Sequence, residues 1–182
     1  MTRGKPRKKP LGLWPRFRRN ERGVTVIEFS MVAAPFIALL LAIFETTITM
    51  FTQQTMETAV EDVSRQIMTG SVQKNSVTQA QFKTKVCSAL PDYIKCSGVM
   101  VDVRTATSLS SADTSTPAIT YNGSGQPTNS WSYDPGDPGD VVIMRVLYLF
   151  PVVSGPLNFS LANAPNSRRL LVSTSIFRNE NF

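Results

Sequence analysis

Histidine is absent from this 182-residue chain, and cysteine occurs only twice. Without an imidazole there can be no Ser-His-Asp triad, no Cys-His dyad, no histidine-ligated metal and no ordinary general base near neutral pH. Two cysteines are too few for a four-cysteine zinc site. No clustered pair of carboxylates or nucleophile motif takes the place of these groups. We therefore expect no catalytic residues, no metal, no cofactor and no enzymatic activity.

Basic residues are scarce after position 23. Residues 1–23 hold nine of the nineteen lysines and arginines and one acid, which gives this leader a net charge of +8. The remaining 159 residues carry ten basic and twelve acidic side chains, a net charge of −2. A body with that balance has no basic stripe to displace counterions from phosphates. We therefore expect no nucleic-acid partner, and only the leader could attract one.

One long apolar run follows the basic leader. Residues 24–44, VTVIEFSMVAAPFIALLLAIF, contain a single charged side chain, that of Glu28. The run is long enough to cross a bilayer, which takes about 20 residues. Positive residues stand directly before it and none directly after it, which predicts a single pass with a cytoplasmic N-terminus and an exported body. Pro35 is expected to kink or loosen the helix, which membranes tolerate.

Two familiar kinds of segment fit this pattern incompletely. A cleaved secretory signal has a shorter apolar region with an A-x-A-like site after it, and residues 41–45 offer no such site. A plain uncleaved anchor accounts for the length and the flanking charges, but it does not account for a carboxylate inside the run. Such a carboxylate is costly unless it finds a partner, so Glu28 is a functional candidate.

The junction R-G-V-T-V-I-E-F at residues 22–29 suggests a third kind of segment. A basic leader that ends in Gly23, followed by an apolar helix with glutamate at its fifth residue, resembles the substrates of prepilin peptidases. In that family the enzyme cuts on the cytoplasmic side after the glycine, here before Val24, and leaves the helix in place. Glu28 would then be residue five, followed by the aromatic Phe29 as in the Flp branch of the type IV pilins.

Cleavage at this bond would provide a partner for the Glu28 carboxylate. It would create an α-ammonium at Val24, one helical turn away, and Glu28 of the same or a neighbouring subunit could pair with it. The pair would compensate the buried charge and set the axial register between subunits. The alternative is an interfacial carboxylate near the start of the span that reaches the lipid headgroups.

Helical spacing continues after the apolar run. Between residues 45 and 70, apolar side chains recur at steps of three to five and predict an amphipathic stalk, with Gly70 as the residue that ends it. Together with the apolar run, this predicts one helix over residues 24–69. The apolar stripe consists of Ile48, Phe51, Met56, Ala59, Val60, Val63 and Ile67.

The rest of the chain, residues 71–182, predicts a small α+β head. A second helix is expected at residues 78–90, and strands are expected at residues 99–104, 141–153 and 170–177. Arg145, within the most apolar strand, should lie near a strand end or pair with an acid. The predicted fold class is thus α+β, a long N-terminal helix packed on an antiparallel sheet of about three strands.

Cysteine placement and composition indicate two further features of the head. Cys87 and Cys96 stand nine positions apart, and in an exported, oxidising compartment two such cysteines are expected to form a disulfide. A redox or metal pair is the alternative, but the chain has no C-x-x-C motif. Residues 105–140 are rich in Ser, Thr, Pro, Gly and Asn and predict a surface loop, with Trp131 and Tyr133 as packing anchors.

Taken in order, these motifs resemble the TadE-like family, the pseudopilins or minor pilins of the tight-adherence (Flp) type IV pilus. The strongest part is the R-R-x-x-x-G-V-x-x-I-E-F opening at residues 18–29. Four weaker pieces follow in sequence: R-x-x-x-T-G before residue 71, the cysteine pair before a Val-Asp-Val strand, V-x-Y-x-F-P, and the terminal F-R-N-E-x-F. The large head separates the chain from the major Flp pilin, which is essentially a helix alone.

The resemblance implies a pilin-like lollipop with four parts: a basic cytoplasmic leader (1–23), a transmembrane helix (24–44), an amphipathic stalk (45–70) and a periplasmic head (71–182). It implies processing by a prepilin peptidase after Gly23, residence in the bacterial inner membrane or incorporation in an extracellular pilus, and a role in pilus assembly or initiation for surface adherence. The implied partners are that peptidase, other pilins or pseudopilins, the Tad assembly platform and membrane lipid. The alternative function is an uncleaved, membrane-anchored periplasmic binding or scaffold protein.

Overall fold

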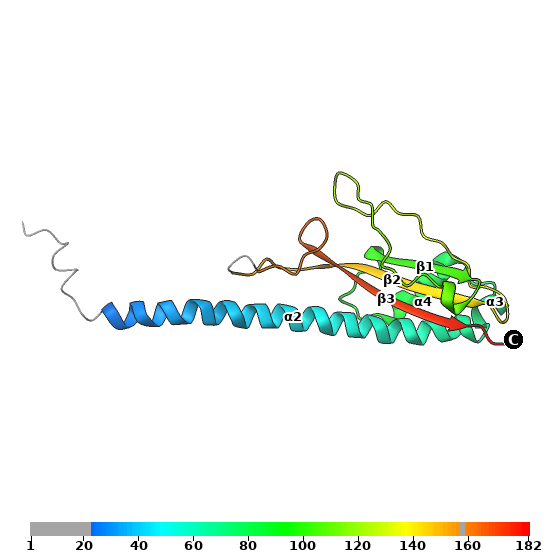
Figure 1. Ribbon diagram of the computed structural model, residues 1–182, viewed down its shortest axis with the longest axis horizontal. Helices are drawn as coiled ribbons and strands as arrows, with labels where there is room; N and C mark the ends of the chain where they lie inside the picture. Colours follow the sequence, from blue (N-terminus) through cyan, green and yellow to red (C-terminus); the bar gives the residue numbers. More distant parts are fainter. Residues whose placement is uncertain (1–22, 157–158) are drawn as a thin grey trace, which may run out of the picture. The chain divides into compact units, whose positions relative to one another are not determined.

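The computed structural model describes residues 23–156 and 159–182, so the leader apart from Gly23 lies outside the described residues. Two compact units are found, one that ends at Leu41 and one that comprises Ala42–Phe182. Figure 1 shows helices followed by a small sheet, and the predicted α+β class is confirmed. The elements are α2 (Val24–Met68), α3 (Ser71–Lys74), α4 (Gln79–Ala89), β1 (Val99–Ala106), β2 (Val141–Pro151) and β3 (Arg168–Arg178), with short 3-10 turns at Cys96–Gly98 and Leu109–Ser111.

Helix α2 ends within one residue of the predicted position. It includes Pro35 and runs to Met68, one residue short of the predicted end. The backbone then enters the left-handed region at Gly70 (φ 73°), where glycine carries no Cβ penalty. The Gly70 amide donates to the Ile67 carbonyl (2.9 Å), which satisfies one of the carbonyl groups that a helix end leaves open.

Helix α4 lies within its predicted range, because its start has a strong local signal. Thr78 accepts a hydrogen bond from the Gln81 amide, and the Gln81 side chain in turn accepts one from the Thr78 amide, a complete capping box. Near its other end, Cys87 forms a disulfide with Cys96, with a Cα–Cα distance of 5.5 Å. The predicted disulfide is thus present, and the chain-entropy model gives such a short loop about 2–3 kcal/mol of stabilisation.

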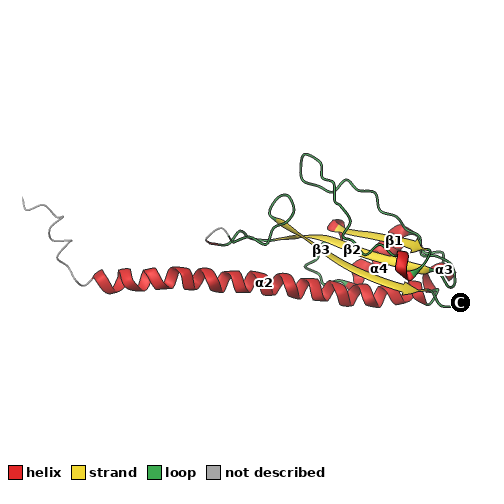
Figure 2. Cartoon of the chain, viewed as in Figure 1, coloured by secondary structure: helices red, strands yellow, loops and turns green. Residues whose placement is uncertain are grey.

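The three strands form one antiparallel sheet in the order β1-β2-β3 (Figure 2). Val101 is paired with Val146, and Leu147 with Val172, so β2 is the central strand. Between α2, α4 and the inner face of this sheet lies the main core. Its largest fully buried side chains include Met56, Val60, Val63, Ile67, Phe82, Val86, Val103, Val142 and Met144.

The loop between β1 and β2 covers part of the outer face of the sheet. Sequence analysis predicts a surface loop here, but Ile119, Tyr121 and Trp131 pack against the outward-facing Leu147 and Leu149. The physical reason lies in β2, which is apolar on both faces and therefore needs cover on both. The prediction that Trp131 anchors this loop agrees with the packing.

A charge cluster centred on the buried Arg145 holds the same loop to the sheet. Arg145, 5% exposed, lies in the middle of β2 and not near its end. Its guanidinium is 3.8 Å from the carboxylate of Asp102 and 3.6 Å from that of Asp113 in the loop, and it also donates to the Asp113 carbonyl. Asp102, 1% exposed, accepts a hydrogen bond from the Ser132 amide (2.9 Å). The predicted pairing of Arg145 with an acid is confirmed.

Candidate functional site

The peptide bond between Gly23 and Val24 lies at the start of α2. Val24 is the first helical residue, and Gly23 is exposed. A Cβ placed on Gly23 would meet no atom within 4 Å, so nothing in the described part of the chain crowds this bond. The junction is therefore accessible, and its cleavage stays a prediction.

Glu28 and Phe29 follow within the first two turns of the helix, and both are exposed. Because residues four apart share a helix face, Glu28 stands one turn from Val24 on the same side. Across residues 23–156 and 159–182 the Glu28 carboxylate makes no ion pair. The intact chain has an ordinary peptide nitrogen at Val24, so the ammonium required for pairing exists only after cleavage. The pairing of Glu28 also stays a prediction.

The large apolar side chains of α2 before residue 42 are exposed, whereas the small Ala38 is 7% exposed. Such a helix is either covered by other molecules or immersed in lipid. Within the described residues, α2 contains a stretch long and apolar enough to cross a membrane, and almost all of that stretch is exposed. A single candidate span near the N-terminus is thus present. Its large exposed side chains are Val26, Ile27, Phe29, Met31, Val32, Phe36, Ile37, Leu39, Leu40 and Leu41.

The second unit continues this apolar character beyond the predicted span. Ile48 and Phe51, which sequence analysis assigns to the stripe that packs under the head, are 55% and 65% exposed. The predicted stripe is wrong at these two positions. Thr49 and Thr52 are buried in their place, each at 1% exposure. The rest of the predicted stripe, from Met56 to Ile67, is buried as the hydrophobic spacing predicts, so the difference is confined to its first two positions.

Threonine can be buried here because its hydroxyl bonds to the helix itself. Thr46, Thr47, Thr49 and Thr52 each donate a hydrogen bond to the carbonyl four residues earlier, at 2.8–2.9 Å. This i to i−4 bond satisfies the hydroxyl without water and presents the methyl group outward. Four polar residues in seven thus become compatible with an apolar environment. Hydropathy patterns do not reveal this effect, because they count threonine as polar.

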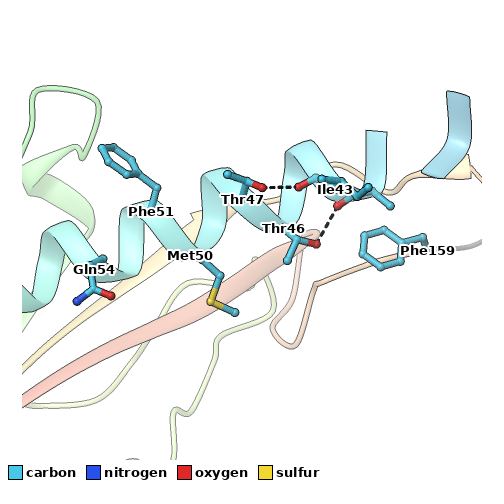
Figure 3. A pocket seen from close by; sticks show the side chains of 8 residues that line it. Ile43, Thr46, Thr47, Met50, Phe51, Gln54 and Phe159 are labelled. Atoms are coloured by element: carbon cyan, nitrogen blue, oxygen red, sulfur yellow. Dashed lines mark hydrogen bonds between the residues drawn. The ribbon is translucent and has the colours of Figure 1, made fainter. Parts of the chain in front are cut away.

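An open hollow of about 650 Å³ lies on this part of the helix. Figure 3 shows the ring of Phe159, from the segment between β2 and β3, beside Ile43, and it marks the back-bonds of Thr46 and Thr47. Met50 and Phe51 contribute further apolar surface. The hollow offers hydrophobic contact and little polar chemistry.

Glu45 is a candidate that sequence analysis leaves without a role. It is the first acid after the apolar run, and one of its carboxylate oxygens is buried without a hydrogen-bond partner in the described part of the chain. A buried carboxylate oxygen without a hydrogen-bond partner is energetically costly, and this cost distinguishes Glu45 from the other acids of α2. The signal available in the sequence was the position of this acid at the border of the span.

No metal-binding cluster of three or more His, Cys, Asp or Glu side chains occurs in the described residues. Two of the three aspartates between Tyr133 and Val141 form hydrogen bonds in or beside the turn. Asp134 accepts from the Thr105 hydroxyl (2.8 Å), and Asp140 accepts from the Asp137 amide (2.9 Å). These bonds account for acids at that spacing without a cation.

Comparison with known families identifies one segment of the chain. The model of the family described as TadE-like protein matches residues 23–65. The matched segment begins at the predicted cleavage junction and continues through most of α2, so the resemblance stated from the sequence is confirmed over this range. No curated protein matches the chain, and no solved structure matches it.

Proposed function

Taking residues 23–65 as a TadE-like segment, we propose that the chain is a non-enzymatic minor pilin or pseudopilin of a Tad pilus. The family match suggests a protein associated with that pilus. The more specific proposal is that a prepilin peptidase removes residues 1–23 and that the remaining chain acts in assembly or initiation of the fibre. The head, residues 71–182, contributes a contact surface and no catalysis.

One observation carries this proposal: an accessible glycine bond directly precedes an exposed apolar helix whose fifth residue is Glu28. The +8 leader would hold residues 1–23 in the cytoplasm, where the proposed peptidase acts. The span would remain in the inner membrane after the cut. The product would be an anchored subunit with a new ammonium beside a carboxylate.

The exposed surface of α2 is compatible with packing against other helices as well as with lipid. About 20 residues suffice for a bilayer, yet exposed apolar side chains continue to Phe51, and the intervening threonine hydroxyls are satisfied within the helix. A helix with this surface can leave lipid and pack against other pilin helices. In that setting Glu28 would pair with the Val24 ammonium of a neighbouring subunit.

N-terminal sequencing and intact mass of the chain recovered from its native membrane test this proposal. We expect the chain to begin at Val24. The variant Gly23→Val, which places a branched side chain at the cut, is expected to keep residues 1–23, and Thr25→Ser, just after the cut, is the matched control that should be processed.

Two results would overturn the proposal. A start at Met1 or Thr2 with an active peptidase would indicate the uncleaved anchor, a periplasmic binding or scaffold protein. A start after Phe44 would indicate a secreted head and would remove the membrane argument as well.

A further inference from the structure

A cavity of about 370 Å³ lies at the end of the sheet where β1 begins. Its walls come from α4, the Cys96–Gly98 turn, the sheet strands and the loop that covers the outer face. Sites for small molecules have volumes of about 300–1,000 Å³, so this one suits a ligand of one or two sugar rings or similar size. It lies entirely within Ala42–Phe182.

The cavity gathers positive charge from three separate segments. Lys83 on α4, Lys95 before β1 and Arg168 at the start of β3 all line it, and no carboxylate does. Residues 24–182 have a net charge of −2, and three of their ten cations meet here. Such an arrangement is not expected from composition, and it produces a local positive potential that attracts an anion.

The three cations have different roles. The Arg168 guanidinium donates to the Pro165 carbonyl (3.2 Å) and to the Gly125 carbonyl, so it is held in place as part of the wall. Within the described residues, the ammonium groups of Lys83 and Lys95 make neither a hydrogen bond nor an ion pair. Both lysines can therefore direct their donors to a ligand.

The other lining residues include the partly exposed Trp131, the buried Tyr148 and two neutral polar side chains. Trp131 and Tyr148 line the cavity, and the Gln126 amide and Ser97 hydroxyl stand near them. In the described part of the chain, the side chains of Gln126 and Ser97 have no hydrogen-bond partner. The Trp131 indole, an amide, a hydroxyl and two lysines match a sugar ring that carries a carboxylate. The C–H face of the sugar would contact the indole, its hydroxyls would bond to the neutral groups, and its carboxylate would pair with lysine.

We propose that this cavity binds an acidic saccharide, a sugar unit that carries a carboxylate. The inference goes beyond the proposed pilus function and does not depend on cleavage, because every lining residue lies in the second unit. It gives the head a ligand-binding role of its own. A phosphate ligand is the competing anion, and the test includes it.

The test is a calorimetric titration of the full chain, purified in a non-ionic detergent, with digalacturonate. We expect saturable binding that weakens as salt concentration rises, because the ligand is charged. Neutral galactobiose is the control for the sugar rings, and inorganic phosphate is the control for the charge. Equal binding of galactobiose, stronger binding of phosphate, or no binding of digalacturonate would each overturn the proposal.

Variants locate the site. Lys83→Gln combined with Lys95→Gln is expected to weaken digalacturonate binding by at least about tenfold, since two charge-assisted hydrogen bonds are lost. Trp131→Leu should also weaken it. Lys85→Gln is the matched control: Lys85 lies on the same helix, donates to Gln66 (3.2 Å) and does not line the cavity. Unchanged affinity in the double variant, with unchanged thermal unfolding, would place binding elsewhere and contradict the assignment.

Discussion

The ring of Phe182 occupies the space that a side chain at position 70 would need, because a Cβ placed on Gly70 falls 2.1 Å from the Phe182 Cγ. The terminal segment is held there by further contacts. The Glu180 amide donates to the Met68 carbonyl (2.8 Å), and the Lys74 ammonium lies 5.5 Å from the centroid of the Phe182 ring. Gly70 therefore ends α2 and also leaves the space in which the Phe182 ring packs.

Gly70→Ala is expected to lower the free energy of unfolding by about 1–3 kcal/mol. Alanine is strained at a φ of 73° and its Cβ overlaps the Phe182 ring. Thermal denaturation of the full chain in detergent measures the loss. Gly123→Ala is the matched control, since a Cβ there meets no atom within 4 Å. In a Phe182→Ala background the Gly70 substitution should cost less, and an equal cost would show that the ring contact is unimportant.

Arg145→Ala should be strongly destabilising, by about 3–5 kcal/mol, because it leaves the Asp102 carboxylate buried with one partner fewer. Arg104 also pairs with Asp102, at 2.9 Å, but its side chain is exposed. Arg104→Ala is therefore expected to change stability by less than about 1 kcal/mol. Unfolding by urea compares the two variants. Equal losses would mean that the burial of Arg145 adds nothing to its pairing.

Because Tyr133 is partly buried, we expect the protein to lose stability at alkaline pH. Burial raises the pKa of Tyr133 to about 12 from its ordinary 10.0. Between these values the unfolded chain releases the phenolic proton while the folded chain retains it, so the free energy of unfolding falls as pH rises from 10 toward 12. Thermal melting across this interval measures the slope.

Tyr133→Phe should reduce that alkaline slope. It also removes the hydrogen bond from the Tyr133 hydroxyl to the Val77 carbonyl (3.0 Å), so the variant is expected to be less stable at neutral pH. Tyr93→Phe, at an exposed position, is the control that should retain the slope. An unchanged slope in Tyr133→Phe would assign the alkaline loss to other groups.

Glu28→Ala tests the proposed pairing with Val24. The substitution makes the span more apolar, so insertion and membrane content should be preserved, whereas incorporation into pili should fall. Membrane fractionation and quantification of surface pili separate the two effects. Ser30→Ala, which removes only a hydroxyl that bonds to the Val26 carbonyl, is the matched control. Normal piliation with Glu28→Ala would leave the carboxylate with an interfacial role only.

Local signals account for what could be predicted. The apolar run, the end of α2 at Gly70, the helix expected at residues 78–90 and the alternation of Val99, Val101 and Val103 each depend on residues close together in the chain. The disulfide was predictable for the same reason, because a nine-residue separation keeps the two cysteines near each other. The span and the junction before it, which carry the proposed function, are also local.

The predictions fail where contacts between segments distant in the chain determine which side chains are buried. Hydrophobic spacing placed Ile48 and Phe51 against the head, but the structure buries Thr49 and Thr52, whose hydroxyls bond to their own helix. In the loop before β2, the prediction that Trp131 packs was correct, but the contacts of Ile119 and Tyr121 with the sheet were not predicted, because the loop is polar in composition and its few apolar side chains are far apart. Only the second apolar face of β2 shows why they are needed.

The sequence by itself determined the α+β class, the helix long and apolar enough to cross a membrane, and the TadE-like junction, because each depends on the local preferences of neighbouring residues. The tertiary structure decided that Thr49 and Thr52 are buried in place of Ile48 and Phe51, how the Arg145 cluster holds the loop, and that Lys83, Lys95 and Arg168 share one cavity. Those three cations are separated by up to 85 positions in the chain. Their meeting depends on strand order and on burial of the sheet faces, which no local pattern encodes.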